Sequence, residues 1–457
     1  MHAHDCRPTP RGLCRTRPAA VLPRGGLPTL RRVLPLLALA VLPLCHAADY
    51  YVAEEGNNEN GGRTQAAAWQ TLQHAVDSVQ PGDRIVVLPG TYSGARIERS
   101  GTAEQPILLE AATNGAVVLN RPGSACRHHS ILELETWQGA GQVARWTIRG
   151  FEIANSPKYG IDIRSGRHIT VRDNHVHHSA ATGIFTAFSD DSLIENNSSH
   201  DNGEHGVYCS NSGDRPIVRG NRLYANQACG VHMNGDLSAG GDGIISGALI
   251  ERNVITENGK RGGSGINLDG VVDSLIRNNL LYDNHASGLS LFKGNGAVCS
   301  SNNRVYNNTV LVPPDGRWAV NIPDDGGINN RVVNNILLSR HTWRGSICIA
   351  AAHPPGFECH HNAVTPVFCV GSVDRSSLRD WEKLGYAAGT FAASPDVLFV
   401  DPARCDYHLR RGSPAVDAGA NLQDVPCDLE GGARPQDGTH TGHARWDLGA
   451  YELQPAP

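Results

Sequence analysis

The chain has 457 residues, a formal net charge of −5 and 40% hydrophobic residues, so it is long enough to bury a large core. Only 19% of the residues are charged and they form no basic patch, which argues against a nucleic-acid partner. With 51 glycines and 2 methionines, the composition suits many tight turns and excludes a helical bundle.

The first 48 residues have the composition of an export signal. Several arginines precede an apolar run at residues 33–44, and Ala47 and Ala48 follow it closely. A basic start, a short apolar stretch and a small-residue end are typical of a secretory signal peptide. A membrane anchor needs about 20 apolar residues, more than this run offers. We therefore expect a secreted or periplasmic protein with no membrane association after cleavage.

A short helix is predicted near the start of the mature chain. Its apolar face consists of Trp69, Leu72, Val76 and Val79. The pair Pro81-Gly82 ends the helix, and an apolar strand at 84–88 starts the first coils. Such a helix would cover the open end of a repeat structure and prevent edge pairing.

Six segments in the middle of the chain share a Gly-apolar-x-apolar pattern. Their glycines are Gly160, Gly183, Gly206, Gly230, Gly265 and Gly288, separated by 23, 23, 24, 35 and 23 residues. A second marker follows each glycine, at Asn174, Asn197, Asn221, Asn253, Asn279 and Asn308. Two markers with a fixed order over six repeats predict a solenoid whose coils share one core.

The alternation within each segment gives the direction of its side chains. The apolar residues face inward and the residues between them face outward. The asparagines are expected to stack as amide ladders at turns. The sequence thus predicts an all-β, right-handed, single-stranded parallel β-helix with an N-terminal capping helix. We expect a signal peptide at 1–48, a cap and first coils at 49–110, a β-helix body at 111–370 and a closing segment at 371–457.

The exported part retains nine cysteines, an odd number that leaves at least one thiol unpaired. Disulfides are permitted outside the cytoplasm. The plausible bridges are Cys405 with Cys427 and pairs among Cys348, Cys359 and Cys369.

Motifs near both ends of the chain carry a family resemblance. They are residues 50–52, 89–92, 406–409, 413–419 and 447–452. They resemble the ends of secreted bacterial β-helix proteins, a group with polysaccharide lyases of the pectate lyase and chondroitinase B kind and mannuronan C5-epimerases. The resemblance covers most of residues 49–452 and implies the architecture. It does not fix the activity, because the group also holds hydrolases and proteins of unknown role.

Outward residues of neighbouring coils should lie about 4.8 Å apart. One outward column consists of Asp162, Phe185, Tyr208, His232, Asn267 and Ser290. A second column, two residues further along each strand, consists of Arg164, Ala187, Ser210, Asn234, Asp269 and Phe292. A polar patch over three coils is therefore expected from Tyr208, His232, Asn234, Asn267 and Asp269. His205 and Arg215 are expected at its rim, as substrate-binding or local hydrogen-bonding residues.

Two coils next to this patch carry insertions. Asn253 follows Gly230 by 23 residues and Asn308 follows Gly288 by 20, where the other coils have 14 or 15. Both insertions, at 235–243 and around 293–296, are expected to leave the same edge of the sheet. Loops on a rigid scaffold are where sites are usually placed.

Two routes to β-elimination from a uronate fit these residues. The reaction needs a neutralised carboxylate, a base for the C5 proton and a proton for the leaving oxygen. In the first route Ca²⁺, which prefers hard oxygen ligands, is held by Asp236, Asp242 and Asp269, with Asn234 as a further ligand. Lys293 is then the base, a role that the resemblance to pectate-type lyases implies.

In the second, metal-free route His232 is the base, Tyr208 donates the proton and Asn267 holds the carboxylate. The same pair suits C5 epimerisation. A glycoside hydrolase needs two carboxylates about 5–10 Å apart, for which Asp269 with Asp236 or Asp242 would serve. In the alternative without catalysis, these side chains only form hydrogen bonds to the backbone of turns or face solvent.

These residues favour a monomeric protein that acts on an acidic polysaccharide, with a lyase as the leading hypothesis. The alternatives are a glycoside hydrolase, a C5-epimerase, and a non-catalytic glycan-binding or cell-envelope protein.

Overall fold

A computed structural model describes residues 47–136, 141–323, 326–350, 354–371 and 374–454, which all belong to one compact unit. Apart from Ala47 and Ala48, the expected signal peptide lies outside the described residues. Export and the expected domain boundaries therefore stay predictions. No helix among the described residues has the length and apolarity needed to cross a membrane.

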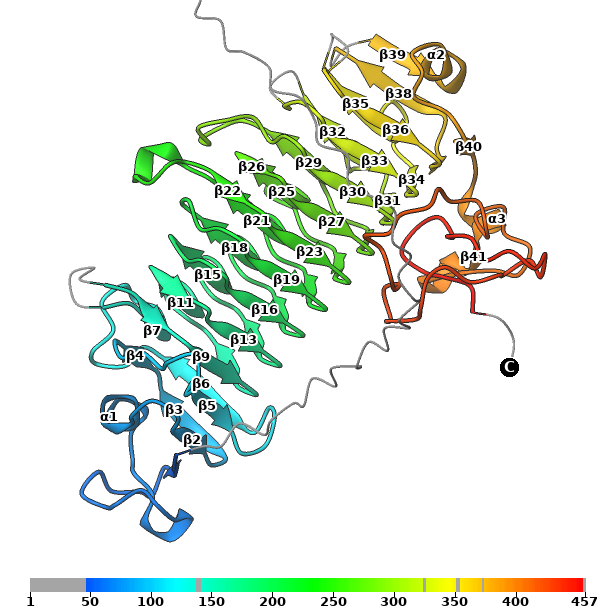
Figure 1. Cartoon of the computed structure of the whole chain (residues 1–457). Helices are drawn as coiled ribbons and strands as arrows, with labels where there is room; N and C mark the ends of the chain where they lie inside the picture. The colour runs from blue at the N-terminus through cyan, green and yellow to red at the C-terminus, as the bar shows by residue number, and fades with distance from the viewer. Residues whose placement is uncertain (1–46, 137–140, 324–325, 351–353, 372–373, 455–457) are drawn as a thin grey trace, which may run out of the picture. The chain divides into compact units, whose positions relative to one another are not determined.

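The described chain winds as a right-handed parallel β-solenoid, which confirms the predicted fold. Each coil adds one strand to each of three sheets, here named A, B and C, and strands of successive coils pair in parallel (Figure 1).

Sheet A consists of β1 (Asp49–Val52), β2 (Arg84–Val87), β5 (Ile107–Ala111), β9 (Trp146–Arg149), β13 (Thr170–Arg172), β16 (Leu193–Glu195), β19 (Ile217–Arg219), β23 (Leu249–Glu251), β27 (Leu275–Arg277), β30 (Arg304–Tyr306), β33 (Arg331–Val333) and β36 (Glu358–His360). Sheet B consists of β3 (Gly90–Ser93), β6 (Val117–Arg121), β10 (Glu152–Ala154), β14 (His175–His177), β17 (Ser198–His200), β20 (Arg222–Tyr224), β24 (Val254–Thr256), β28 (Leu280–Tyr282), β31 (Thr309–Val312), β34 (Ile336–Ser339), β37 (Ala363–Val364) and β40 (Phe391–Ala392).

Sheet C consists of β4 (Ala95–Ile97), β7 (Leu132–Leu134), β11 (Ile161–Arg164), β15 (Ile184–Ala187), β18 (Val207–Ser210), β21 (Val231–Asn234), β25 (Ser264–Asp269), β29 (Ser287–Phe292), β32 (Val320–Ile322), β35 (Ile347–Ile349), β38 (Val367–Val370) and the antiparallel β39 (Asp374–Ser377). The remaining elements are β8 (Val143–Ala144), β12 (Gly166–Arg167), β22 (Ile245–Ser246), β26 (Val271–Val272), β41 (Phe399–Asp401), β42 (Asp406–Leu409), α1 (Leu72–Ser78), α2 (Leu378–Lys383), α3 (Pro395–Leu398) and the 3₁₀ turns η1 (Gln65–Ala67), η3 (Leu237–Ala239) and η4 (Pro402–Arg404).

The marker glycines lie just before or at the start of the sheet C strands, where the next coil approaches too closely for a side chain. A Cβ added at Gly183 would lie 2.2 Å from the Ser199 hydroxyl, and one at Gly230 would lie 2.4 Å from Ile255. Both neighbours belong to sheet B of the following coil, so the glycines permit tight stacking.

The marker asparagines are buried and form the predicted amide ladder between sheets A and B. Asn253 Oδ1 accepts hydrogen bonds from the backbone N–H and the Nδ2 of Asn221, each at 3.0 Å. Its own Nδ2 donates to the Val218 carbonyl and to Asn279 Oδ1, each at 2.9 Å. A second ladder, not expected from the marker asparagines, follows sheet B and consists of Asn202, Asn226, Asn258 and Asn284.

The N-terminal helix is present as α1 and begins after Thr71, whose hydroxyl accepts the His74 N–H. Its buried residues Leu72, Ala75 and Val76 join the main core, and the helix lies beside β4 at the first coils (Figure 1). The predicted capping helix is therefore confirmed.

The C-terminal segment packs on the outer face of sheet B. Leu398, Leu448 and Ala450 form one buried cluster with Leu280 and Ile336 of that sheet. This contact covers the outward residues of the later sheet B strands.

The expected bridge between Cys405 and Cys427 is wrong, because both side chains are unbridged thiols. Cys405 ends the exposed turn η4, whereas Cys427 pairs by its backbone with Ala433. Cys359 lies on β36 in the main core, on a different sheet from Cys348 and Cys369, so it pairs with neither. Cys348 and Cys369 are register neighbours on β35 and β38.

An interior ladder residue should contribute more to stability than an exposed asparagine. Asn253→Ala leaves buried N–H and C=O groups without partners, at about 1–3 kcal/mol for each group. We expect a clear drop in the urea midpoint for Asn253→Ala and little change for Asn421→Ala, whose side chain is exposed and whose backbone is not left-handed. Equal midpoints for the two variants would contradict a stabilising ladder.

Candidate functional site

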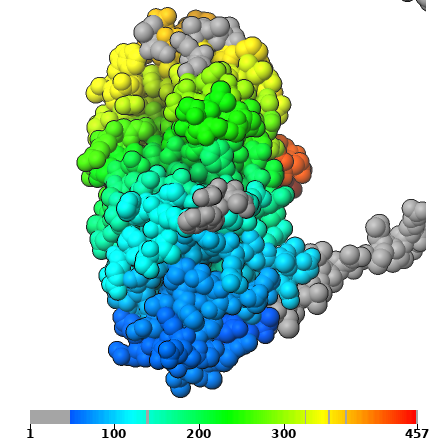
Figure 2. Space-filling view, turned by 90° about the vertical axis from the view of Figure 1, so that its left-hand side faces the viewer, coloured from blue at the N-terminus to red at the C-terminus, as the bar shows by residue number. Residues whose placement is uncertain are grey.

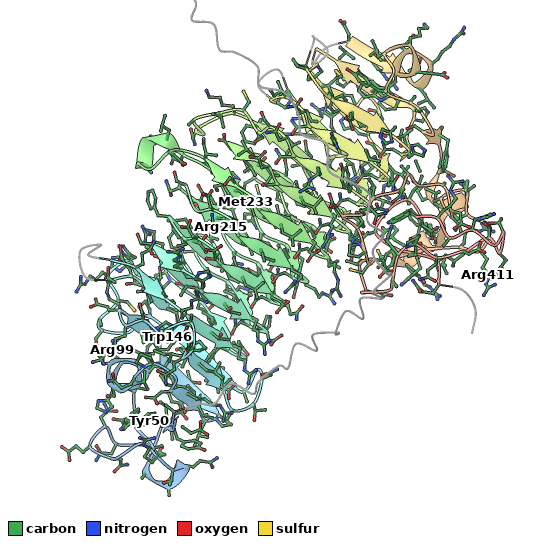
Figure 3. The ribbon with its side chains drawn as sticks, viewed as in Figure 1. Tyr50, Arg99, Trp146, Arg215, Met233 and Arg411 are labelled. Atoms are coloured by element: carbon green, nitrogen blue, oxygen red, sulfur yellow. The ribbon has the colours of Figure 1, made fainter. Side chains whose placement is uncertain are left out.

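Both predicted outward columns of sheet C are present in the predicted order. Tyr208 pairs in register with His232, which pairs with Asn267, and Ser210, Asn234 and Asp269 follow the same order. Tyr208, His232 and Asn267 are partly exposed on the outer face, whereas the neighbouring Met233 is fully buried inside the solenoid (Figure 3).

Three rings form a compact group on this face. The rings of Tyr208 and His232 stack with centroids 4.6 Å apart, and His205 lies 4.8 Å from His232 and 5.0 Å from Tyr208. Asn267 lies directly above His232 in the next coil. We call His205, Tyr208, His232 and Asn267 the His–Tyr cluster.

Hydrogen bonds fix the groups of this cluster. The Nδ1 of His232 lies 3.1 Å from the Asn267 carbonyl oxygen and 3.2 Å from the Asn267 Nδ2. Asn234 Nδ2 donates to the Tyr208 hydroxyl at 3.3 Å, and its Oδ1 accepts the Asp236 N–H at 3.1 Å. The Cys229 N–H donates to His205 Nδ1 at 3.1 Å, so neutral His205 carries its proton on Nε2.

Burial keeps the cluster uncharged near neutral pH. Burial, together with the smaller effect of the nearby His232, lowers the pKa of His205 to about 3. Burial also lowers the pKa of His232 and raises the pKa of Tyr208. The cluster therefore combines neutral imidazoles, a protonated phenol and carboxamides, which is a set suited to moving a proton.

The two insertions meet at the edge where sheet C turns into sheet A, as predicted. Leu237 N–H donates to the Asn295 carbonyl at 2.9 Å, and Ala297 N–H donates to the Gly243 carbonyl at 2.8 Å. Figure 2 views the molecule from the side on which loop 235–243 projects in Figure 1. The loops thus form one joined wall beyond the His–Tyr cluster.

The three predicted carboxylate ligands are engaged separately. Asp269 is buried, and its oxygens accept the backbone N–H groups of residues 294, 295 and 296 at 2.7–3.1 Å. Asp236 accepts from Ser238, and Asp242 from the Ile244 N–H. No group of three or more His, Cys, Asp or Glu suited to a metal occurs among the described residues. As placed, these carboxylates do not fit a shared Ca²⁺ site, and Ca²⁺ binding stays a prediction.

Lys293 and Arg215 lie apart from the His–Tyr cluster. Lys293 is exposed in the second loop, just after Phe292. Arg215 lies in the turn between sheets C and A, and its guanidinium binds Asp191 at 2.7 Å (Figure 3). The structure therefore joins His205, Tyr208, His232, Asn234 and Asn267, and leaves Lys293 and Arg215 at the edge.

Phe185 of the predicted outward column extends the cluster, and its aromatic neighbour Tyr159 was not predicted from the sequence. Tyr159 stacks on Phe185 with centroids 4.4 Å apart, and Phe185 meets Tyr208 edge-on at 5.3 Å. The Lys158 ammonium lies 5.0 Å from the Tyr159 ring centre and the Arg164 guanidinium 5.3 Å from that of Phe185. Tyr159 precedes a marker glycine, as His205 does, and this shared position was the available signal.

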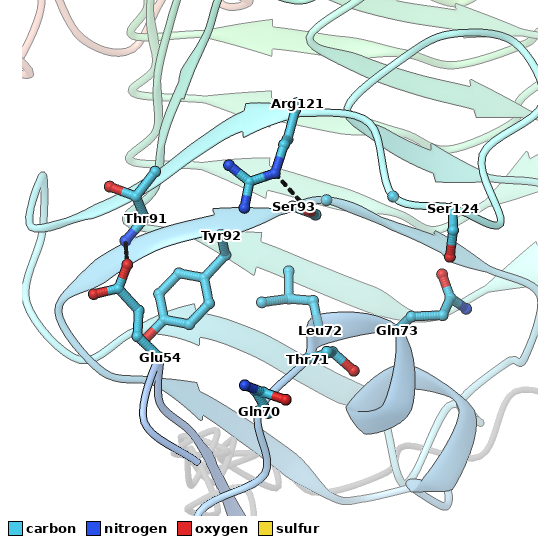
Figure 4. A pocket seen from close by; sticks show the side chains of 12 residues that line it. Glu54, Gln70, Thr71, Leu72, Gln73, Thr91, Tyr92, Ser93, Arg121 and Ser124 are labelled. Atoms are coloured by element: carbon cyan, nitrogen blue, oxygen red, sulfur yellow. Dashed lines mark hydrogen bonds between the residues drawn. The ribbon is translucent and has the colours of Figure 1, made fainter. Parts of the chain in front are cut away.

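A separate hollow of about 460 Å³ lies at the N-terminal corner between α1, β3 and the end of β6 (Figure 4). Glu54, Gln70 and Arg121 line it, and Arg121 donates to the Ser93 hydroxyl at 2.8 Å. It contains no histidine and is several coils away from Tyr208. This hollow is therefore no part of the His–Tyr cluster.

Comparison with known proteins gives a match over most of the solenoid. Residues 50–315 match the family described as Pel9A-like, right-handed beta helix region. The chain is 24% identical over 338 residues to the uncharacterized protein YwoF of Bacillus subtilis (strain 168), covering 65% of this chain and 70% of that protein.

Solved structures show the same fold at low identity. The crystal structure of pectate lyase Pel9A matches with a TM-score of 0.59 and 17% identity, covering 90% of this chain and 97% of that chain. The complex of XylC with xylose matches with a TM-score of 0.55 and 11% identity, covering 89% and 98%.

The low pKa of His205 predicts acid sensitivity. Between its ordinary pKa of 6.5 and about 3, the unfolded chain binds a proton that the folded chain does not. The free energy of unfolding therefore falls as the pH falls through this range, with a slope of up to about 1.4 kcal/mol per pH unit from this residue.

His205→Asn retains an acceptor for the Cys229 N–H and removes the titration, so its stability should fall less steeply with acid. Urea unfolding of both proteins at several pH values measures the two slopes. The exposed His443→Asn serves as the control. Parallel slopes for His205→Asn and the unmodified protein would refute the assigned shift.

Proposed function

The chain belongs to the Pel9A-like right-handed β-helix family, in agreement with the resemblance to the pectate lyase group, and on this premise we propose that it cleaves a uronate-containing polysaccharide by β-elimination. The observation that carries the proposal is the stacked pair of Tyr208 and His232 beside Asn267 on the outer face of sheet C. The C-terminal segment covers part of sheet B, whereas the His–Tyr cluster remains partly exposed.

His232 is the proposed base. When Nδ1 donates its proton to the Asn267 carbonyl, Nε2 is left with a lone pair that accepts the C5 proton. Its lowered pKa keeps the imidazole neutral near pH 7, which a base requires. The same tautomer leaves the Asn267 Nδ2 free to donate to the substrate carboxylate.

Tyr208 is the proposed acid. As the C5–H bond breaks, its electron pair forms the C4–C5 double bond, the C4–O bond breaks, and the leaving oxygen takes the phenol proton. The raised pKa keeps the phenol protonated until that step, and Asn234 orients its hydroxyl at 3.3 Å. Stacked rings on adjacent coils hold acid and base together before substrate arrives.

C5 epimerisation is the second candidate, because the same acid and base suit return of the proton to the opposite face. Hydrolysis receives less support, because Asp269 would be one of the two carboxylates and its oxygens already accept three backbone N–H groups.

Digestion of a panel of uronate polysaccharides, analysed by ultraviolet absorbance and mass spectrometry, tests the reaction. A lyase yields unsaturated ends and products without added water. We expect His232→Ala and Tyr208→Phe to lower kcat by about 10²–10⁴-fold, the usual contribution of a general base or acid. The exposed His443→Ala should retain full activity.

Products with added water would favour a hydrolase, and an altered C5 configuration without chain cleavage would favour an epimerase. Full activity in His232→Ala would remove the proposed base.

The metal-free route also predicts the behaviour of Lys293 and of added chelator. Because Lys293 is exposed and the three carboxylates are engaged separately, Lys293→Ala and EDTA should each leave kcat within about twofold. Initial rates measured with EDTA and after added Ca²⁺ check this. Loss of activity in EDTA that Ca²⁺ restores would instead support the calcium route.

A further inference from the structure

The outer face of sheet A carries a column of charged residues, one on each of seven successive coils. In register order they are Glu110, Arg149, Arg172, Glu195, Arg219, Glu251 and Arg277. The column lies on a different sheet from the His–Tyr cluster and has no role in the proposed reaction.

Salt bridges join the register neighbours of this column except at the two steps that involve Arg172. Glu110 binds both Arg84 and Arg149. Glu195 binds Arg219 at 2.7 Å, and Glu251 lies 2.6 Å from Arg277 and 3.6 Å from Arg219. Each carboxylate of the column therefore forms its salt bridges with arginines other than Arg172.

Within this column Arg149 and Arg172 are the one pair of like charges in direct register. In the described part of the chain the charge partner of Arg172 is Asp173, with its Nε 3.5 Å from the carboxylate. The Nε of Arg172 is buried and has no hydrogen-bond partner among the described residues. Because this Nε is buried, a ligand would bind the terminal nitrogens of Arg172, whose side chain is 36% exposed.

A hollow of about 390 Å³ opens at this step. Its lining includes both arginines, Thr147, Thr170, Leu193 and the acidic Glu195. Thr147 and Thr170 are register neighbours between Leu108 below and Leu193 above, so two short side chains stand between two longer ones. The hollow combines two guanidinium groups with two hydroxyls and apolar ends, and the carboxylate of Glu195 at its rim is bound by Arg219 at 2.7 Å.

We propose that this hollow is a second glycan-binding site that takes a sugar residue bearing a carboxylate. The carboxylate lies between Arg149 and Arg172, in the position where the column lacks an acid. Guanidinium groups bind carboxylates by paired, charge-assisted hydrogen bonds, and the threonine hydroxyls contact the sugar hydroxyls. The choice of a uronate rather than another carboxylate rests on the proposed function.

Binding of D-galacturonate to the full chain carrying His232→Ala tests the site without turnover. Titration calorimetry should show D-galacturonate binding at least tenfold more tightly than D-galactose or sulfate. Adding Arg172→Gln should weaken galacturonate binding by at least tenfold. Arg331→Gln is the matched control, because Arg331 is also on sheet A and pairs with Glu358 at 3.2 Å, and it should bind galacturonate unchanged.

Equal binding of galactose would overturn the carboxylate preference, and equal binding of sulfate would reduce the site to a general anion site. Unchanged binding in Arg172→Gln would overturn the location. Thermal unfolding of Arg172→Gln should match the parent, because Arg172 is the surplus cation. If the protein binds galacturonate through Arg172 but cleaves no uronate polysaccharide, the second site is supported and only the lyase proposal is refuted. If it cleaves the polysaccharide but does not bind galacturonate through Arg172, the lyase proposal is supported and the second site is refuted.

Discussion

Parallel hydrogen bonding between successive coils, held in fixed register, is the constraint on which every other feature depends. The asparagine ladders enforce it, because each carboxamide both accepts from one coil and donates to the next. They join Asn174 to Asn197 across 23 residues and Asn221 to Asn253 across 32 with the same contacts. Extra residues can therefore enter a coil without shifting the sheets.

This register builds the His–Tyr cluster from residues that are far apart in the chain. His232 and Asn267 are separated by 35 residues and still meet, because both hold the same position within their coils. The rigid strands fix ring positions in advance, which reduces the entropy that a reacting site must lose. Residues of this face can therefore act together because they hold equivalent positions in successive coils.

The sequence was sufficient wherever periodicity determined the outcome. The outward columns through Tyr208 and Asn234 followed from alternation along each strand, and the Asn253 ladder followed from the asparagine that recurs after each marker glycine. Non-periodic segments were not predictable in this way. The hydrogen bonds of Asp269 come from three backbone N–H groups of a loop, and the repeat pattern does not determine the path of that loop. The placement of Leu448 on sheet B likewise depends on packing between segments distant in sequence.

The backbone hydrogen bonds between loops 235–243 and 293–298 tie together two insertions that lie two coils apart. Neither loop has its observed path independently, since each supplies partners for the other and residues 294–296 also close over Asp269. Gly296 would collide with Gly270 if it carried a Cβ, so the second loop also has little room to move. Transplanting one loop between relatives would break the shared contacts, whereas exchanging both as a cassette would preserve them and change the rim beside the rings.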